Sequence, residues 1–127
     1  MREYKFRAWD KRKEKFRDDV YIDGDGNLYE FSKKTGYGTA ISYLNDEYID
    51  VTQCTGLVDK SGQEIYEGDV YHLGDENIKY IVVWHDASLI GNQIGTSGYA
   101  GLSYWQDDIE ILGNIFENPE LIKGRQK

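Results

Sequence analysis

The chain has 127 residues, a formal net charge of −8, and hydrophobic and aromatic contents of 39% and 14%. That length suits one domain with enough core to fold without disulfides or a metal, and the aromatic content argues against an intrinsically disordered chain. The single cysteine excludes an intramolecular disulfide. No apolar run reaches the roughly twenty residues of a membrane helix, and the N-terminus lacks the apolar stretch of a secretory signal. The expected compartment is therefore the cytoplasm, with no membrane partner.

The acidic residues are concentrated in the second half of the chain. Residues 1–50 carry ten Lys and Arg against eleven Asp and Glu, a net charge of −1, whereas residues 51–127 carry five against twelve, a net charge of −7. Non-specific binding to nucleic acid depends on clustered basic side chains, which the second half lacks. One basic cluster lies in the first half, where a solvated turn between two strands is its simplest interpretation. Its members are Lys11, Arg12, Lys13, Lys15 and Arg17.

Along residues 1–54, short apolar and aromatic runs separated by turn residues predict strands. Residues 4–9 form a first strand, and a charged turn at 10–15 leads into a second strand at 16–22. The run Asp23-Gly24-Asp25-Gly26-Asn27 is the strongest hairpin signal, and it predicts a tight turn into a strand at 28–31. A glycine-bearing loop at 33–39 then precedes strands at 41–44 and 48–54.

In the second half, turns at 59–62 and 67–69 enclose a brief extended pair at 65–66. Strands follow at 70–73 and 78–85, and the continuous apolar run at 81–84 predicts burial on both faces. Residues 87–101 contain four glycines and form the longest segment predicted to be flexible. Strands are expected again at 102–105 and 109–112. Asn118-Pro119-Glu120 then places a cap residue, a proline and an acid at the start of one short helix, which ends at Gly124; no other helix is expected.

Three ordered segments, residues 4–10, 53–70 and 111–121, resemble the YopX family of bacteriophage and prophage proteins. The resemblance spans nearly the whole chain and implies a single YopX-like domain over 1–127, with an N-terminal β lobe of about 1–52 and a C-terminal lobe of about 53–122. The family has no established biochemistry, and its pattern usually has an aromatic residue at the position of Cys54. The motif residues expected to be structural are Trp9, Gly56, Gly62, Gly68, Asp69, Gly113, Asn114, Asn118 and Pro119.

The expected fold is mostly β, with two small β lobes and a short C-terminal helix. The Glu67-Gly68-Asp69 turn enters a strand at residue 70, and the apolar strand at 78–84 returns antiparallel to it. That arrangement is typical of small barrels of the SH3-like kind, so an SH3-like barrel is predicted for the C-terminal lobe. A fold of this kind does not by itself indicate a function.

Two motifs were weighed as metal sites. Asp23, Asp25 and Asn27 could begin a calcium loop, but lysine stands where that loop needs its last carboxylate, and a hairpin turn is the better interpretation. His72 and His85, with nearby aspartates, could hold zinc, but two histidines without cysteine or close spacing give weak support. Both histidines are expected to be polar surface residues. No metal or cofactor is expected.

No enzyme signature is present. Cys54 lacks the surroundings of an activated thiol and is expected to pack as a small apolar residue. The carboxylate pairs could perform acid–base chemistry only in a shared cleft, and the acids of the glycine-bearing motif, Asp59, Glu67 and Asp69, are better explained as turn-stabilising. The carboxylate pairs are Glu64 with Glu67, Asp107 with Asp108, and Glu117 with Glu120. No catalytic residue is therefore expected.

The leading functional hypothesis is a non-enzymatic phage or prophage accessory protein that acts through protein–protein contacts or by self-association into a homo-oligomer. Its partner is an unidentified protein, and its expected contact surface is Tyr99, Tyr104 and Trp105, because aromatic side chains on loops favour recognition. The alternative is a nucleic-acid-related protein, which either binds through the basic turn at 11–17 or mimics DNA with its acidic half. The net charge argues against nucleic acid as the partner. A third hypothesis is an enzyme that uses the His72 and His85 region.

Overall fold

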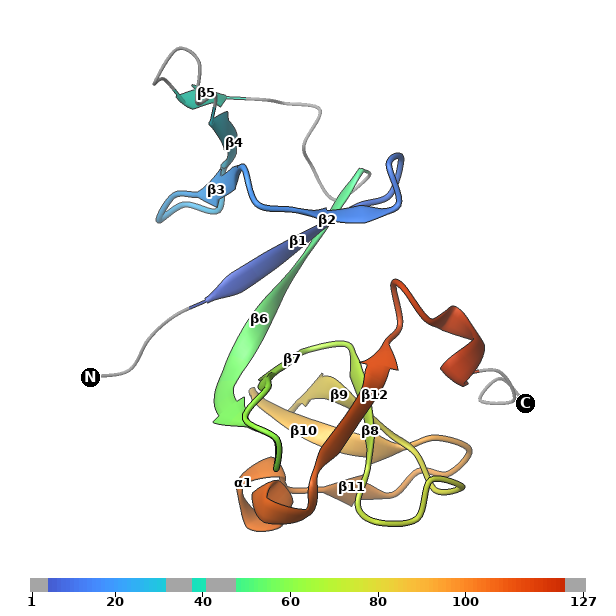
Figure 1. Ribbon diagram of the computed structural model, residues 1–127. Helices are drawn as coiled ribbons and strands as arrows, with labels where there is room; N and C mark the ends of the chain where they lie inside the picture. The colour runs from blue at the N-terminus through green and yellow to red at the C-terminus, as the bar shows by residue number, and fades with distance from the viewer. Residues whose placement is uncertain (1–4, 32–37, 41–47, 123–127) are drawn as a thin grey trace. The chain divides into compact units, whose positions relative to one another are not determined.

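The computed structural model describes residues 5–31, 38–40 and 48–122, which are drawn as ribbons in Figure 1. The chain forms two compact units, one of residues 6–51 and one of residues 1–5 together with 52–127. We call these the N-terminal unit and the C-terminal unit. Strand β6, Ile49–Val58, passes from the first into the second. The boundary lies close to the one expected between the two lobes.

The N-terminal unit consists of short antiparallel strands. Its small core contains the buried Ala8 and Ile49, with partly buried side chains such as Val20 and Leu28 packed around them. Strand β1 pairs with β2 on one side and β6 on the other, and β3, β4 and β5 form a second sheet. The bounds are β1 Phe6–Asp10, β2 Lys15–Arg17, β3 Val20–Ile22, β4 Leu28–Phe31 and β5 Gly38–Ala40.

The tight turn predicted at 23–27 is confirmed, because Ile22 pairs with Leu28 across the β3–β4 hairpin. The prediction of one continuous strand at 16–22 is wrong, because the segment forms two strands, β2 and β3. Asp18 and Asp19 interrupt it, and its two parts belong to different sheets. Strand β5 begins inside the segment that was expected to be a loop, and the strand predicted at 41–44 lies outside the described residues.

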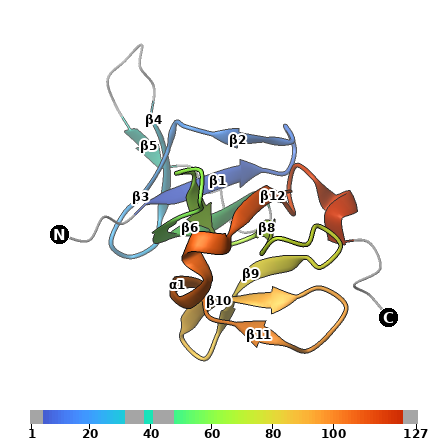
Figure 2. The same cartoon turned by 60° about the horizontal axis from the view of Figure 1, so that its bottom comes forward.

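The C-terminal unit is built around a five-stranded antiparallel sheet in the order β11-β10-β9-β8-β12, which curves as a half-barrel (Figures 1 and 2). Strand β6 pairs with β7 beside it. The core is formed by Ile65, Tyr71, Val82, Leu102 and Ile109. The remaining bounds are β7 Glu64–Tyr66, β8 Asp69–His72, β9 Tyr80–His85, β10 Ser88–Gln93, β11 Tyr99–Ala100 and β12 Glu110–Asn114.

The mostly β prediction is confirmed, whereas the finer SH3-like description stays a prediction. Segment 87–101 was expected to be flexible, but most of it forms the β10–β11 hairpin, in which Gly91 pairs with Ala100. Position 91 requires glycine because of packing: a Cβ there would lie 1.7 Å from the buried Tyr71 hydroxyl. The glycine therefore does not indicate a flexible segment. In the apolar run at 81–84, Ile81 and Val82 are buried but Trp84 is exposed, so the expectation of burial on both faces fails at its end.

Residues 102–105 form helix α1, Leu102–Trp105, and not the predicted strand. A 3₁₀ turn, η1 Gln106–Asp108, follows it. Four residues anchored by one buried leucine show no helical periodicity, so the pattern could not reveal this helix. The predicted C-terminal helix is a single 3₁₀ turn, η2 Pro119–Ile122. Over the ranges that the structure describes, no helix has the length and apolar character needed to cross a membrane.

Replacing Gly91 by alanine should destabilise the C-terminal unit, because Tyr71 leaves no room for the added methyl group. We expect the free energy of unfolding, measured by urea denaturation, to fall by about 1–3 kcal/mol. Gly101→Ala is the matched control, since its backbone is extended (φ −70°) and a Cβ there meets no atom within 4 Å. Equal stability of the Gly91→Ala variant and the wild type would contradict the packing of Tyr71 against β10.

Candidate functional site

The motif segment at 53–70 is held together by the carboxylate of Asp59. One oxygen, Oδ1, accepts hydrogen bonds from the Ser61 amide (2.9 Å), the Ser61 hydroxyl (2.7 Å) and the Gln63 amide (2.9 Å). The other, Oδ2, accepts from the Ile111 amide of β12 at 3.2 Å. Burial raises the pKa of Asp59, but these hydrogen bonds together hold it below the ordinary value. Asp59 therefore ties the β6–β7 turn to β12.

A second connection is made at Gly68 and Asp69. Gly68 has a φ of 93°, a conformation that favours glycine. Its N–H donates to the Val82 carbonyl at 2.9 Å, and its carbonyl accepts from the Ile115 amide at 3.0 Å. Asp69 is buried, and its Oδ2 accepts from the Tyr66 amide at 2.7 Å. These contacts join the turn after β7 to β9 and to the end of β12.

The C-terminal motif forms a closed set of turn contacts. Asn114 Oδ1 accepts from the amides of Phe116 (3.0 Å) and Glu117 (2.8 Å), and Asn118 Oδ1 accepts from the Asn114 amide at 3.2 Å. A Cβ on Gly113 would lie 2.4 Å from Asn118 Oδ1, which explains glycine there. Pro119 begins η2.

The other motif residues also have structural contacts. Gly56 and Gly62 have φ values of 87° and 92° in the β6–β7 region. Trp9 is buried in the N-terminal unit, where its ring meets that of Phe16 edge-on at 5.0 Å. The hydrogen bonds and packing around the motif residues are therefore those of residues that build the fold.

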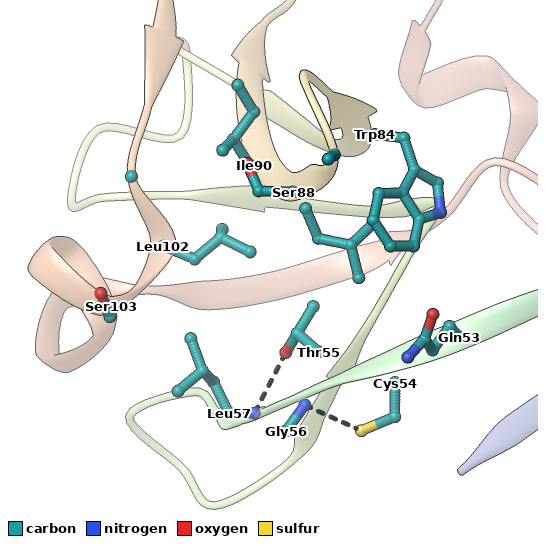
Figure 3. A pocket seen from close by; sticks show the side chains of 13 residues that line it. Gln53, Cys54, Thr55, Gly56, Leu57, Trp84, Ser88, Ile90, Leu102 and Ser103 are labelled. Carbon is teal, nitrogen blue, oxygen red and sulfur yellow. Dashed lines mark hydrogen bonds between the residues drawn. The ribbon is translucent and has the colours of Figure 1, made fainter. Parts of the chain in front are cut away.

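An open groove of about 400 Å³ lies in the C-terminal unit and includes residues 53–57 of the motif segment, just before the Asp59 turn. Its walls come from three segments far apart in the sequence: β6, the β9–β10 turn with the start of β10, and the start of α1. In Figure 3, Trp84 and Gln53 lie toward one end of the groove, and Leu57 and Leu102 lie toward the other. The lining residues are Gln53, Cys54, Thr55, Gly56, Leu57, Trp84, Ala87, Ser88, Leu89, Ile90, Gly101, Leu102 and Ser103.

Exposed aromatic side chains are carried on the elements that form the groove. Trp84 is 50% exposed and lines it. Tyr104, 82% exposed, and Trp105 follow the lining residue Ser103 in α1, and their rings meet edge-on at 5.0 Å. Tyr99 stacks on His85 with ring centroids 4.2 Å apart. The expected contact residues Tyr99, Tyr104 and Trp105 are all exposed, and Tyr104 and Trp105 continue the helix whose start lines the groove, but none of the three lines it.

The turn between β9 and β10 is strained. Asp86 and Ala87 both have positive φ, 49° and 67°, although neither is glycine. A side chain in this left-handed region costs about 1–2 kcal/mol, and such strain is often found at functional positions. Ala87 lines the groove next to Trp84, so the strained turn presents the tryptophan at the end of the groove.

The two histidines are not brought together. His72 was expected on the surface, and this prediction is wrong because the side chain is buried. Its Nδ1 accepts a hydrogen bond from the Gly74 amide at 2.9 Å, and its Nε2 lies 3.3 Å from the Glu110 carboxylate. His85 is exposed and lies 3.2 Å from Asp86. Because Tyr71 pairs with Tyr80, the antiparallel register puts His72 and His85 at opposite ends of β9. Among the described residues, no group of three or more His, Cys, Asp or Glu could hold a metal ion.

The remaining candidate residues, Asp23 and Cys54, accept hydrogen bonds from amides close to them in the sequence. Asp23 Oδ1 accepts from the amides of Asp25 and Asn27, both at 2.9 Å, and the hydrogen bonds from Asn27 contribute most to a pKa of about 2 for Asp23. This geometry fits a hairpin turn. Cys54 is buried, and its Sγ accepts from the Gly56 amide at 3.5 Å.

Much of the basic cluster at 11–17 makes contacts inside the N-terminal unit. Lys11 Nζ lies 3.3 Å from Asp50, and the Arg12 guanidinium lies 4.5 Å from the centre of the Tyr48 ring. The guanidinium of Arg17 is buried and makes ion pairs with Asp10, Asp19 and Glu30. Hydrogen bonds to Asp19 are the main reason that the pKa of Arg17 is raised. Arg17 therefore serves the fold of this unit.

Three comparisons place the chain among known proteins. A family model described as YopX protein matches residues 5–123, which confirms the family resemblance. Among solved structures, protein EF1440 from Enterococcus faecalis is 23% identical with a TM-score of 0.66, and covers 97% of this chain and 100% of that chain. The protein yopX from Bacillus subtilis is 18% identical with a TM-score of 0.64 and the same coverage. At these identities the two structures show the fold alone. No curated protein matches the chain.

The groove could not be recognised from the sequence, because its three walls become neighbours only in the folded unit. Trp84 was the most visible signal that was missed. It ends an apolar run immediately before His85 and Asp86, and a polar sequence after an aromatic residue is compatible with an exposed strand end. Leu57, Leu89 and Leu102 resemble any other core residues in sequence.

Replacing Asp59 by asparagine should lower the free energy of unfolding by about 1–3 kcal/mol at pH 7, because an amide cannot accept all four hydrogen bonds. Chemical denaturation measures this change. Glu76→Gln, which neutralises an exposed acid of the same unit, is the control and should be within about 0.5 kcal/mol of wild type. An equal effect of the two variants would contradict the role of Asp59 in joining β12.

The effect of Asp59 should also depend on pH. Its folded-state pKa lies below the ordinary value, so its contribution is complete above the pKa of an unfolded aspartate, about 4. The contribution is lost as the pH falls through the lower folded-state pKa. The difference in unfolding free energy between wild type and Asp59→Asn should therefore shrink below about pH 4. A difference that stays constant down to pH 2 would contradict stabilisation by the ionised carboxylate.

Ala87→Gly should stabilise the protein, because glycine adopts a positive φ without strain. The expected gain is about 0.5–1 kcal/mol, after the greater entropy of glycine in the unfolded chain is subtracted. Thermal unfolding measures it. Ala100→Gly in β11 is the control, and it should destabilise by about 0.5–1 kcal/mol since no strain is relieved there. Loss of stability in both variants would show that the turn at Ala87 is not strained.

Proposed function

Since the chain belongs to the YopX family over residues 5–123, we propose that it is a non-enzymatic protein-binding module whose contact site is the groove of the C-terminal unit. The resemblance to phage and prophage proteins suggests an accessory role in the cytoplasm of a bacterial host. The single observation that carries the proposal is an open groove with leucine and isoleucine in its walls, near which the aromatic side chains of Trp84 and Tyr104 are left exposed.

The composition of the groove favours binding over catalysis. Its walls contain Leu57, Leu89, Ile90 and Leu102, and its polar side chains are amide and hydroxyl groups apart from the Cys54 thiol. The described residues that line it include no histidine, carboxylate, lysine or arginine. Walls that combine apolar side chains with uncharged hydrogen-bonding groups suit a site that binds and orients a ligand.

The exposed aromatic residues favour a protein as the ligand. Tryptophan and tyrosine are enriched among the side chains that dominate protein–protein interfaces. Trp84 and Tyr104 lie beside the groove and remain half or more exposed, so the isolated chain leaves a large apolar area in contact with water. Covering that area with a partner would recover part of its hydrophobic free energy. Self-association would satisfy the same requirement if the partner is a second copy.

The nucleic-acid alternative is supported less well by the same geometry. Binding through the basic turn at 11–17 would draw on side chains that already contact the N-terminal unit, above all Arg17. Mimicry of DNA by the acidic half would also require a protein partner, and it therefore leads to the same first experiment.

Capture of partners from a bacterial host lysate by tagged protein should depend on Trp84 and Tyr104. We expect a nuclease-resistant partner near one-to-one stoichiometry, with recovery reduced about tenfold by Trp84→Ala or by Tyr104→Ala, because interface aromatics contribute roughly 1–2 kcal/mol or more each. Mass spectrometry and quantitative blotting measure the recovery. Tyr21→Ala, which removes an exposed tyrosine of the N-terminal unit, is the control.

Two outcomes would contradict the proposal. Partners that are retained only while nucleic acid is intact, and that are lost on charge reversal of Arg12 and Lys13, would favour the nucleic-acid alternative. A partner whose recovery falls with Tyr21→Ala but not with Trp84→Ala would move the contact site to the N-terminal unit.

A further inference from the structure

The groove has the length of a short extended peptide. The β6 residues that form one wall, 53–57, contain an irregularity at Gly56, and at the usual rise of a strand they extend over at most about 13 Å. Four or five residues of an extended peptide cover the same distance. The apolar walls formed by Leu57, Leu89 and Leu102 can receive alternate side chains of such a peptide, since these point to the same face.

Carboxylates stand near both ends of the groove. Asp86 follows Trp84 and His85 in the β9–β10 turn, and its side chain is 89% exposed. Asp107 and Asp108 are exposed on η1. The neighbouring Gln106 donates from Nε2 to the Val58 carbonyl at 3.1 Å, which places η1 beside the Leu57 end of the groove. Negative charge is thus present near each end of the groove.

Described basic residues of the C-terminal unit do not neutralise this charge. Lys5 and Lys60 make ion pairs with Glu64 and Glu110 at 2.7 and 3.1 Å. Lys79 immediately precedes β9, at the end of the strand away from the groove. An occupant that carries positive charge would complement the carboxylates at the two ends of the groove.

The exposed rings beside the groove add a second attraction for cations. Trp84 and Tyr104 present aromatic faces to solvent, and a lysine or arginine side chain over such a face gains about 0.5–1 kcal/mol or more. Carboxylates favour the same side chains by direct charge attraction. Both features select a positively charged ligand, whereas an acidic peptide would be repelled.

We propose that the occupant of the groove is a short, extended, cationic peptide segment of a partner protein, with lysine or arginine on either side of an apolar anchor. This inference rests on the proposed binding function, and it specifies the partner's chemistry. The apolar side chains of the peptide lie between Leu57, Leu89 and Leu102. Its basic side chains reach Asp86 at one end, and Asp107 and Asp108 at the other.

The test uses the full chain and three capped pentapeptides that alternate leucine and phenylalanine with lysine, glutamine or glutamate. Binding is followed by tryptophan fluorescence and by alkylation of a thiol introduced as Ser103→Cys, in a chain in which the buried Cys54 is replaced by alanine. Position 103 is exposed and lines the groove, so protection of the introduced thiol reports occupancy of that site. The measurements are made at low and at high ionic strength.

The lysine peptide should bind about tenfold more tightly than the glutamine peptide at low ionic strength, as expected for three exposed charge pairs. Added salt should remove that preference. The combined variant Asp86→Asn, Asp107→Asn and Asp108→Asn should bind both peptides equally, and both should still protect the introduced thiol. Trp84→Ala should weaken binding of both.

Equal affinities for the lysine and glutamine peptides, or tighter binding of the glutamate peptide, would overturn the cationic assignment while leaving the groove as a binding site. Failure of all three peptides to protect the introduced thiol would overturn the assignment and count against the proposed function as well. A fluorescence change without protection of that thiol would place the peptide on another surface and would have the same meaning.

Discussion

The C-terminal unit depends on one buried carboxylate. Burying an ionised group is unfavourable unless hydrogen bonds replace its water, and Asp59 accepts four of them, three from its own turn and one from Ile111. Beside it, the Lys60 amide donates to the Ile109 carbonyl at 2.9 Å. Strand β12 is at the edge of its sheet, so these bonds both fix the strand and satisfy an edge amide that could otherwise pair with another chain.

This arrangement separates the residues that build the unit from those available for binding. Asp59, Gly68 and Asn114 make their hydrogen bonds inside turns and between strands. The groove lies elsewhere, between β6, the β9–β10 turn and α1, and its prominent side chain Trp84 is held by a strained turn. The turns of the family motifs therefore build the scaffold, whereas the proposed contact site combines the motif residues 53–57 of β6 with residues of the β9–β10 turn and α1, which lie outside the motifs.

The sequence could predict those features that depend on contacts between residues close together in the chain. The turn at 23–27 was predictable because Asp23 binds amides two and four residues ahead of it. The hairpin at 88–100 was not, because Gly91 is required by Tyr71 on another strand. His72 was placed on the surface for a similar reason: its burial depends on β12 and on Glu110. Tyr99, Tyr104 and Trp105 were predicted as a contact surface, but the groove requires three walls that only the folded unit brings together.

If partners contact the C-terminal unit at the groove, site-specific photo-crosslinking in host cells should capture them there. A photoreactive phenylalanine analogue would replace Tyr104 beside the groove in one protein and Tyr21 of the N-terminal unit in another, both of which are exposed. We expect a discrete crosslinked protein from position 104 that is absent from position 21, and that disappears when Trp84→Ala is added. A crosslink from position 21 alone, or one from position 104 that survives Trp84→Ala, would contradict contact at the groove.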